Sequence, residues 1–342
     1  CEDACNRRDK DGAVSINAME RFLGDWGLQR KLALPLAESD SRTESVGVIG
    51  AGPAGLSFGY QMARRGYRVT IYEKQELPGG MLYFGIPQYR LPEAVLAAEI
   101  GRILDLGVEL KPNTAIGRDI SVQQLRDLHD VVFLGIGAGL GRKLDIPGED
   151  GADVWTGTDF LSQLNRGNKV ELGAHVVVVG GGNTAMDAAR AARRTGAQVT
   201  QLYRRTREEM PAIETEIDDA LAEGVEITYL AAPIAIGRES GRVRSVRVQR
   251  MELGEPDGSG RRKPVPVGGS EQDIPASAVI AAVSQEPDWE GLSELQDGKI
   301  WIHAGPNGEV DHGLWAGGDA LGPGIARQPI AQGRQAAEAV HA

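Results

Sequence analysis

Residues 45–73, SVGVIGAGPAGLSFGYQMARRGYRVTIYE, decide the fold. An apolar run at 46–49 predicts a buried strand, and Gly50, Gly52 and Gly55 give the GxGxxG spacing of a turn from strand to helix. Glycines at this spacing let the backbone approach a pyrophosphate, and the helix that follows offers its free N–H groups to the anion.

The same stretch continues into a second strand that ends in an acid. Gly66 marks the end of the helix, 69–72 is rich in β-forming residues, and Glu73 follows Gly50 by 23 positions. A carboxylate at this point accepts hydrogen bonds from a ribose 2′-OH. Since strand, turn, helix, second strand and acid are all present, we predict a dinucleotide site rather than a turn without a ligand.

Length and composition favour a two-domain α/β protein. The chain has 342 residues, enough for two hydrophobic cores, and its 46 glycines exceed the usual share of about 7 %. The formal net charge of −11 argues against nucleic acid or an anionic membrane as a main partner. No run approaches the roughly 18 apolar residues of a membrane span.

The N-terminal segment, 1–41, is predicted to be helical, with Ile16, Met19, Phe22, Leu23 and Trp26 on one apolar face. The chain begins without methionine and shows no signal peptide, so we expect a processed or truncated product, or part of a longer chain, in the cytoplasm.

Cysteine occurs at two positions, Cys1 and Cys5, too few for a disulfide-built scaffold. The pair is either two free thiols at a frayed end or the last two ligands of an iron–sulfur cluster. A four-iron cluster takes about four thiolates, so a cluster requires ligands outside this chain.

Two further glycine-rich stretches follow the first unit. The stretch 77–92, LPGGMLYFGIPQYRLP, is either a loop that covers a planar ligand or a surface loop with a small apolar cluster of its own. A helix is predicted at 93–106. A second glycine turn, at 135–139, indicates a further close approach of the backbone, although no helix and acid follow it.

The opening pattern recurs at 175–205. A β-branched run at 176–179 leads into Gly180, Gly182 and Ala185, but this unit ends in Arg204 and Arg205, 24 positions after Gly180 in the case of Arg204. Guanidinium groups bind a 2′-phosphate, whereas an acid repels it. The second site is therefore predicted to prefer NADP(H) over NAD(H), unless the two arginines only cover a solvated face.

The rest of the chain predicts an antiparallel inset and a closing helix. Alternation within 242–283 favours antiparallel strands inserted in the second domain. Asp319, after a strand at 314–316, is placed either to bind a polyol hydroxyl or to cap a turn. A helix from about Pro329 would turn its positive N-terminus toward an anion.

Taken together, these motifs resemble the flavoprotein family of the small (β) subunit of NADPH-dependent glutamate synthase, which includes the flavin domain of dihydropyrimidine dehydrogenase. The resemblance covers nearly the whole chain. The motifs that carry it are CEDACNRRDKDGAVSINAMERF, VGVIGAGPAGLS with IYEK, PGGMLYFGIPQYRLP, VVVVGGGNTAMDAAR with LYRRTREEMPA, and WAGGDA with IAQGRQAA.

The resemblance implies an α/β fold like that of glutathione reductase, with two Rossmann-like domains. An NAD(P)H-binding domain, 151–284, would be inserted in a discontinuous FAD-binding domain, 42–150 plus 285–342, after the helical segment 1–41. The residues expected to contact FAD are Gly50, Ala51, Gly52, Pro53, Ala54, Glu73, Lys74, Gly80, Met81, Arg90, Gly137, Gly318, Asp319, Gln328, Pro329 and Ile330. Those expected to contact NADPH are Gly180, Gly182, Asn183, Thr184, Arg204 and Arg205.

The implied activity is electron transfer between NAD(P)H and an iron–sulfur subunit or ferredoxin within a hetero-oligomeric complex. No catalytic side chain is expected, because a hydride passes to flavin N5 and the flavin carries the chemistry. The family's upstream cluster cysteines are absent, and neither nucleotide site has the CxxC of a disulfide reductase. The alternatives are a self-contained flavin reductase for a small substrate and a non-catalytic subunit that bears FAD as a scaffold.

Overall fold

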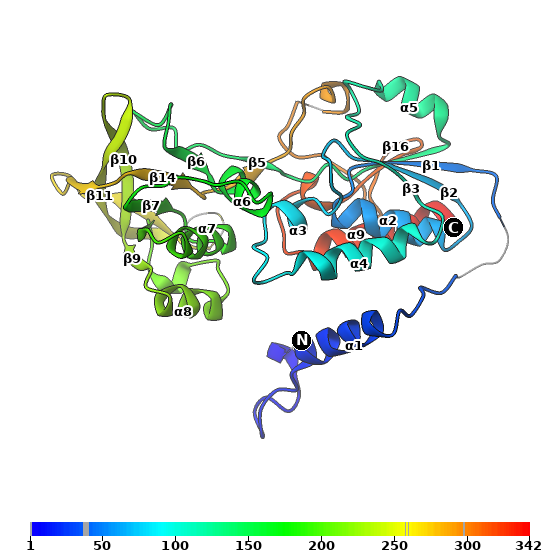
Figure 1. Cartoon of the computed structure of the whole chain (residues 1–342), viewed down its shortest axis with the longest axis horizontal. Helices are drawn as coiled ribbons and strands as arrows, with labels where there is room; N and C mark the ends of the chain where they lie inside the picture. Colours follow the sequence, from blue (N-terminus) through cyan, green and yellow to red (C-terminus); the bar gives the residue numbers. More distant parts are fainter. Residues whose placement is uncertain (1, 37–40, 257, 259, 297) are drawn as a thin grey trace.

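The computed structural model describes residues 2–36, 41–256, 258, 260–296 and 298–342. They form two halves side by side, each built on a largely parallel sheet (Figure 1). The predicted α/β fold class is confirmed, whereas the domain boundaries at 41, 150 and 284 stay predictions.

The first sheet draws strands from both ends of the chain. Its order is β16 (Glu309–Asp311), β17 (Leu314–Ala316), β4 (Val131–Leu134), β1 (Ser45–Ile49), β2 (Arg68–Tyr72) and β3 (Glu109–Lys111). All neighbouring pairs are parallel except β16 with β17. Leu314 pairs with Val132, so a strand near the C-terminus completes a sheet begun near the N-terminus.

The second sheet comes from the middle of the chain and is parallel throughout. Its order is β6 (Val154–Thr156), β14 (Ala278–Ala281), β7 (His175–Val179), β8 (Gln198–Tyr203) and β9 (Glu226–Tyr229). An antiparallel inset of β10 (Ala231–Glu239), β11 (Arg242–Pro256), β12 (Arg262–Pro266) and β13 (Gln272–Pro275) packs on one face. The inset begins at Ala231, earlier than the predicted 242, because the strand after the Leu230 turn continues directly into it.

The helices lie around the two sheets, with the first of them at the margin of the molecule (Figure 1). They are α1 (Ile16–Gln29), α2 (Pro53–Ala63), α3 (Met81–Phe84), α4 (Glu93–Leu104), α5 (Val122–Leu128), α6 (Gly157–Asn165), α7 (Asn183–Arg194), α8 (Glu214–Ala222) and α9 (Arg327–His341). Short 3₁₀ turns lie at Glu2–Ala4, Arg207–Glu209, Ser293–Leu295 and Gly318–Ala320.

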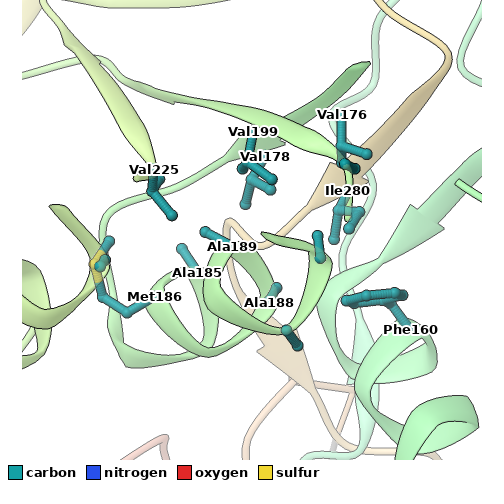
Figure 2. Packing of buried hydrophobic residues seen from close by; sticks show 14 of the residues in the cluster. Phe160, Val176, Val178, Ala185, Met186, Ala188, Ala189, Val199, Val225 and Ile280 are labelled. Carbon is teal, nitrogen blue, oxygen red and sulfur yellow. The ribbon is translucent and has the colours of Figure 1, made fainter. Parts of the chain in front are cut away.

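Small side chains let α7 lie close to the second sheet. Figure 2 shows Ala185 and Ala189 on the side of this helix that faces the strands carrying Val178 and Val199. Because alanine adds little bulk, the helix that follows the second glycine turn is held near the carboxyl ends of β7 and β14.

Two segments join the halves. β5 (Leu140–Gly141) leads out of the first half, β15 (Gln285–Glu286) leads back, and the two pair in antiparallel fashion. The chain therefore crosses between the halves twice along one short ribbon, as expected for an inserted unit.

Three local predictions need correction. The loop 77–92 contains a helical turn, α3, since Tyr83 and Phe84 donate backbone hydrogen bonds to Gly80. Helix α4 ends at Leu104, two residues before the predicted end. Helix α9 begins at Arg327 rather than Pro329, because a proline is tolerated within the first turn, where its missing N–H is not needed.

The predicted N-terminal helix is present as α1, beside α4 at the margin of the molecule (Figure 1). Its apolar residues Met19, Phe22 and Leu23 are each more than half exposed. None of the described helices is long and apolar enough to cross a bilayer.

Close packing of α2 against α9 generates a stability prediction. A Cβ at Gly333 would collide with the Ala54 carbonyl oxygen and lie 3.0 Å from the Phe58 nitrogen. We expect Gly333→Ala to lower the free energy of unfolding by about 1–3 kcal/mol, measured by urea denaturation. The matched control is Gly101→Ala on α4, where a Cβ meets nothing within 4 Å and helix propensity improves. Equal stability of the two variants would contradict the packing argument.

Candidate functional site: two nucleotide turns and the cleft between the halves

The first glycine turn connects β1 to α2. Gly50 has a φ of +94°, and a Cβ there would lie 2.6 Å from the Gly135 carbonyl oxygen at the end of β4. The sequence predicts a close approach of the backbone at 135–139, and in the structure Gly135 of this stretch lies against Gly50. Gly52 caps α2 in an extended conformation without a side chain over the helix end. The turn leaves the first N–H groups of α2 open to an anion.

Two segments distant in sequence meet the start of α2. A Cβ at Gly80, where φ is +53°, would lie 2.9 Å from the Gly52 Cα, and one at Gly318 would lie 3.0 Å from the Ala54 Cβ. Glycine at these positions keeps the backbone close to the helix end without filling the space around it. This cradle fits the pyrophosphate of a dinucleotide such as FAD.

Glu73 lies beneath the first turn and is buried. Its carboxylate accepts hydrogen bonds from the Ala51 N–H, at 2.7 Å, and from the Gln75 N–H, at 2.9 Å. Burial raises the pKa of this carboxyl, while the two backbone donors act in the opposite direction. Glu73 therefore shapes the turn itself, and its predicted ribose contact stays a prediction.

The second glycine turn repeats the first between β7 and α7. A Cβ at Gly180 would collide with the Ala282 carbonyl oxygen, just as Gly50 meets the end of its neighbouring strand. Gly182 caps α7. Asn183 Oδ1 accepts a hydrogen bond from the Ile213 N–H at 3.0 Å, and the Thr184 hydroxyl accepts one from Gln285 Nε2 at 3.2 Å. The start of α7 is therefore held both to the segment before α8 and to the returning linker.

A cleft of about 980 Å³ opens at this second turn. Its walls include Gly180, Gly182 and Thr184 from the middle of the chain, and Asp319 and Gln328 from the end. Burial raises the pKa of Asp319, whose carboxylate accepts a weak hydrogen bond of 3.3 Å from the Gly324 N–H. Residues expected at the FAD site and at the NADPH site thus line one space.

The lining of the cleft is strongly basic. Among the described lining residues the cationic side chains are Arg142, Lys143, Arg204, Arg205 and Arg261, and Asp319 is the one carboxylate. Arg204 is exposed, whereas Arg205 is 3 % exposed and donates from Nε to the Arg262 carbonyl oxygen at 2.7 Å. The basic pair predicted from sequence therefore divides into one residue that is open to solvent and one that is bound to the inset.

Arg90 bridges the two halves. Its Nη1 lies 2.7 Å from both oxygens of Asp187 on α7, and its Nη2 lies 3.2 Å from Glu216 on α8. Asp187 is 4 % exposed, and burial raises the pKa of its carboxyl while Arg90 lowers it. Next to it, the Tyr89 ring lies under the Arg194 guanidinium, 3.6 Å from the ring centroid. The sequence predicts that Arg90 contacts FAD. The structure shows its ion pair with Asp187, and the FAD contact stays a prediction.

The other predicted residues fall into two groups. Ala51, Pro53, Ala54 and Pro329 are buried or half-buried around the first turn. Lys74 donates to Asp288 at 2.7 Å, Met81 begins α3, Gly137 has open space around its Cα, and Ile330 is 47 % exposed. The ligand contacts predicted for these residues stay predictions.

The structure describes one of the two cysteines that were predicted as possible cluster ligands. Cys1 lies outside the described residues. Cys5 is a free thiol whose Sγ accepts a hydrogen bond from the Val14 N–H at 3.4 Å, and this bond lowers its pKa. Within the described part of the chain, no three His, Cys, Asp or Glu side chains gather as a metal site.

Sequence reasoning missed Asp187, Arg142 and Arg261. Asp187 lies inside a helix with no motif to distinguish it. Arg261 belongs to a basic run, 261–263, in the inset, and this run was the available signal. Only the fold shows that it reaches the cleft.

Comparison with known proteins agrees with this geometry. The chain matches the model of the pyridine nucleotide-disulphide oxidoreductase family over residues 44–339. It is 41 % identical to the NADP(+)-dependent formate dehydrogenase subunit beta of Moorella thermoacetica, over 99 % of this chain and 52 % of the relative. It is also 41 % identical to the NADPH-Fe(3+) oxidoreductase subunit beta of Geobacter sulfurreducens, over 84 % of this chain and 44 % of that protein.

The glutamate synthase (NADPH) small chain of Azospirillum brasilense is 35 % identical, over 100 % of this chain and 75 % of the relative. Among solved structures, FprA from Mycobacterium tuberculosis superposes with a TM-score of 0.76 at 19 % identity, covering 88 % of this chain and 84 % of FprA. The chain spans about half the length of the first two relatives.

The chain belongs to the pyridine nucleotide-disulphide oxidoreductase family, and the resemblance to the glutamate synthase small subunit is confirmed. It is an NAD(P)H-dependent oxidoreductase of an FAD- and NADP-dependent family, so the predicted enzyme class and cofactors are confirmed at this level.

The Arg90 ion pair yields a second prediction. Arg90→Met leaves the buried Asp187 carboxylate without its partner, so we expect the free energy of unfolding to fall by about 3 kcal/mol in urea denaturation. Adding Asp187→Leu to this variant removes the stranded charge and should restore much of the loss. Arg118→Met, which breaks an exposed pair with Asp119, serves as the control and should change stability little. A similar loss in Arg118→Met and Arg90→Met would show that burial does not set the cost.

Proposed function

We propose that this chain is the flavin unit of an electron-transfer enzyme that moves electrons between NADPH and an iron–sulfur protein within a hetero-oligomeric complex. The single cleft lined by both nucleotide-binding halves carries the proposal. A hydride passes between two bound nucleotides only if their reactive rings meet, and residues expected at each of the two sites line this cleft.

On the NADPH side, the chain binds and orients the nucleotide. The N-terminus of α7, capped by Gly182, offers backbone N–H groups to the pyrophosphate. Arg204, beyond the end of β8, supplies a cation for the 2′-phosphate. Thr184 is hydrogen-bonded to Gln285 of the returning linker, and the two residues form one wall of this site.

On the FAD side, the glycine cradle at Gly52, Gly80 and Gly318 would hold the pyrophosphate, and α9 would face the redox ring. The first turn of α9 contains no acidic residue, so its partial positive charge stabilises an anionic ligand. FAD held there would supply the capacity to take a hydride from NADPH and to pass electrons on one at a time. The protein supplies position and field, and no side chain is required as a nucleophile.

The acceptor is proposed to lie outside this chain. Cys5, the one described cysteine, does not line the cleft, and neither nucleotide motif of the sequence contains the CxxC of a disulfide reductase. The two relatives at 41 % identity are named as beta subunits, one of a formate dehydrogenase and one of an Fe(3+) oxidoreductase. An iron–sulfur cluster held on another subunit or segment fits both names.

Anaerobic titration tests this proposal. Protein loaded with FAD should lose its flavin absorbance on addition of NADPH, and NADH should require a much higher concentration because it lacks the 2′-phosphate. The reduced protein should then reduce a four-iron ferredoxin and leave an aromatic disulfide such as 5,5′-dithiobis(2-nitrobenzoate) intact.

Failure of NADPH to bleach the flavin would refute the proposal. Reduction of the disulfide in preference to the ferredoxin would instead support a self-contained reductase.

A further inference from the structure

Arg261 lines the NADPH cleft from the antiparallel inset rather than from the dinucleotide-binding unit. It is exposed and directly precedes β12. The local sequence of the second glycine unit does not include it, since 56 positions separate it from Arg205.

Contacts from the end of β8 fix the segment that carries Arg261. The Arg205 Nε donates to the carbonyl oxygen of Arg262, the next residue, at 2.7 Å. The Arg262 side chain in turn reaches back, with its Nε 3.1 Å from Glu209 Oε1. The Arg205 hydrogen bond holds the backbone next to Arg261, and the Glu209 hydrogen bond holds the Arg262 side chain.

Glu209 is itself firmly placed. Its Oε2 accepts a hydrogen bond from the Thr206 N–H at 3.1 Å, and its carbonyl oxygen accepts one from the Tyr203 hydroxyl at 2.6 Å. Tyr203 is the last residue of β8 and is buried. The start of β12 is therefore attached to the carboxyl end of β8, where a dinucleotide fold places the ribose 2′ position.

We propose that Arg261 reads the 2′-phosphate of NADPH together with Arg204, and that the buried Arg205 positions Arg261 through the Arg262 carbonyl. The inference rests on the proposed function of the cleft as the NADPH site. A dianionic phosphate accepts several charge-assisted hydrogen bonds, and two exposed guanidinium groups from different elements can supply them from two sides.

Calorimetric titration of the FAD-loaded full chain with 2′,5′-ADP and with AMP tests the inference without turnover. Arg261→Gln should weaken 2′,5′-ADP binding about tenfold or more, the worth of one charge-assisted hydrogen bond, and change AMP binding less than about twofold. The matched control is Lys263→Gln, which removes a neighbouring exposed charge that does not line the cleft. It should leave both affinities nearly unchanged.

The role of Arg205 is tested by a double-mutant cycle. If Arg205 acts through Arg261, Arg205→Met should weaken 2′,5′-ADP binding, and adding Arg261→Gln should cause little further loss. Additive losses would show that Arg205 reads the phosphate directly and would overturn the positioning role. Arg261 is exposed, so the Arg261→Gln result decides the main point even if the Arg205 variant does not fold.

The outcomes separate this inference from the proposed function. If Arg261→Gln changes the affinities for 2′,5′-ADP and AMP equally, or changes neither, Arg261 does not bind the 2′-phosphate and the inference is overturned. If the unsubstituted protein binds 2′,5′-ADP no better than AMP, the cleft is not an NADPH site and the proposed function fails with the inference.

Discussion

The ion pair between Arg90 and Asp187 fixes how the two halves face each other. The linkers that join them pair over only two residues each, so they leave the relative orientation to contacts elsewhere. Asn165 adds to the same interface by donating from Nδ2 to the Tyr83 and Ile86 carbonyl oxygens, both at 2.9 Å. Since the cleft takes its walls from both halves, its shape depends on a buried charge that α7 supplies and the segment after α3 neutralises.

The charge of the cleft is opposite to that of the molecule. The chain carries a formal net charge of −11, yet the charged residues among the described lining of the cleft are five cations and one carboxylate. An acidic surface repels nucleic acid and other polyanions, while a basic cleft with low-dielectric walls concentrates a small phosphate-bearing ligand. Selectivity for such a ligand therefore begins with the field of the whole protein, before any single hydrogen bond forms.

Sequence predicted the features that depend on near neighbours. Both glycine turns, their helices and the strands beside them follow from spacing within about 30 residues. The start of α9 was misplaced because a proline inside the first turn resembles one at its beginning. The pairing of Arg90 with Asp187 spans 97 positions and that of Arg205 with Arg262 spans 57, so neither leaves a local pattern. Tertiary contact alone decides which arginine is buried and which is exposed.

The pairing of β17 with β4 has a consequence for biosynthesis. All strands of the second sheet lie between residues 154 and 281, so this sheet is complete while the chain is still being made. The first sheet is complete only after residues 314–316 have been synthesised, and α2 remains uncovered until α9 has been synthesised. A nascent chain thus holds β4 with an unpaired edge until residues 314–316 leave the ribosome. The first sheet is therefore completed later than the second, and during that interval its uncovered strand edge is exposed to chaperones and to aggregation.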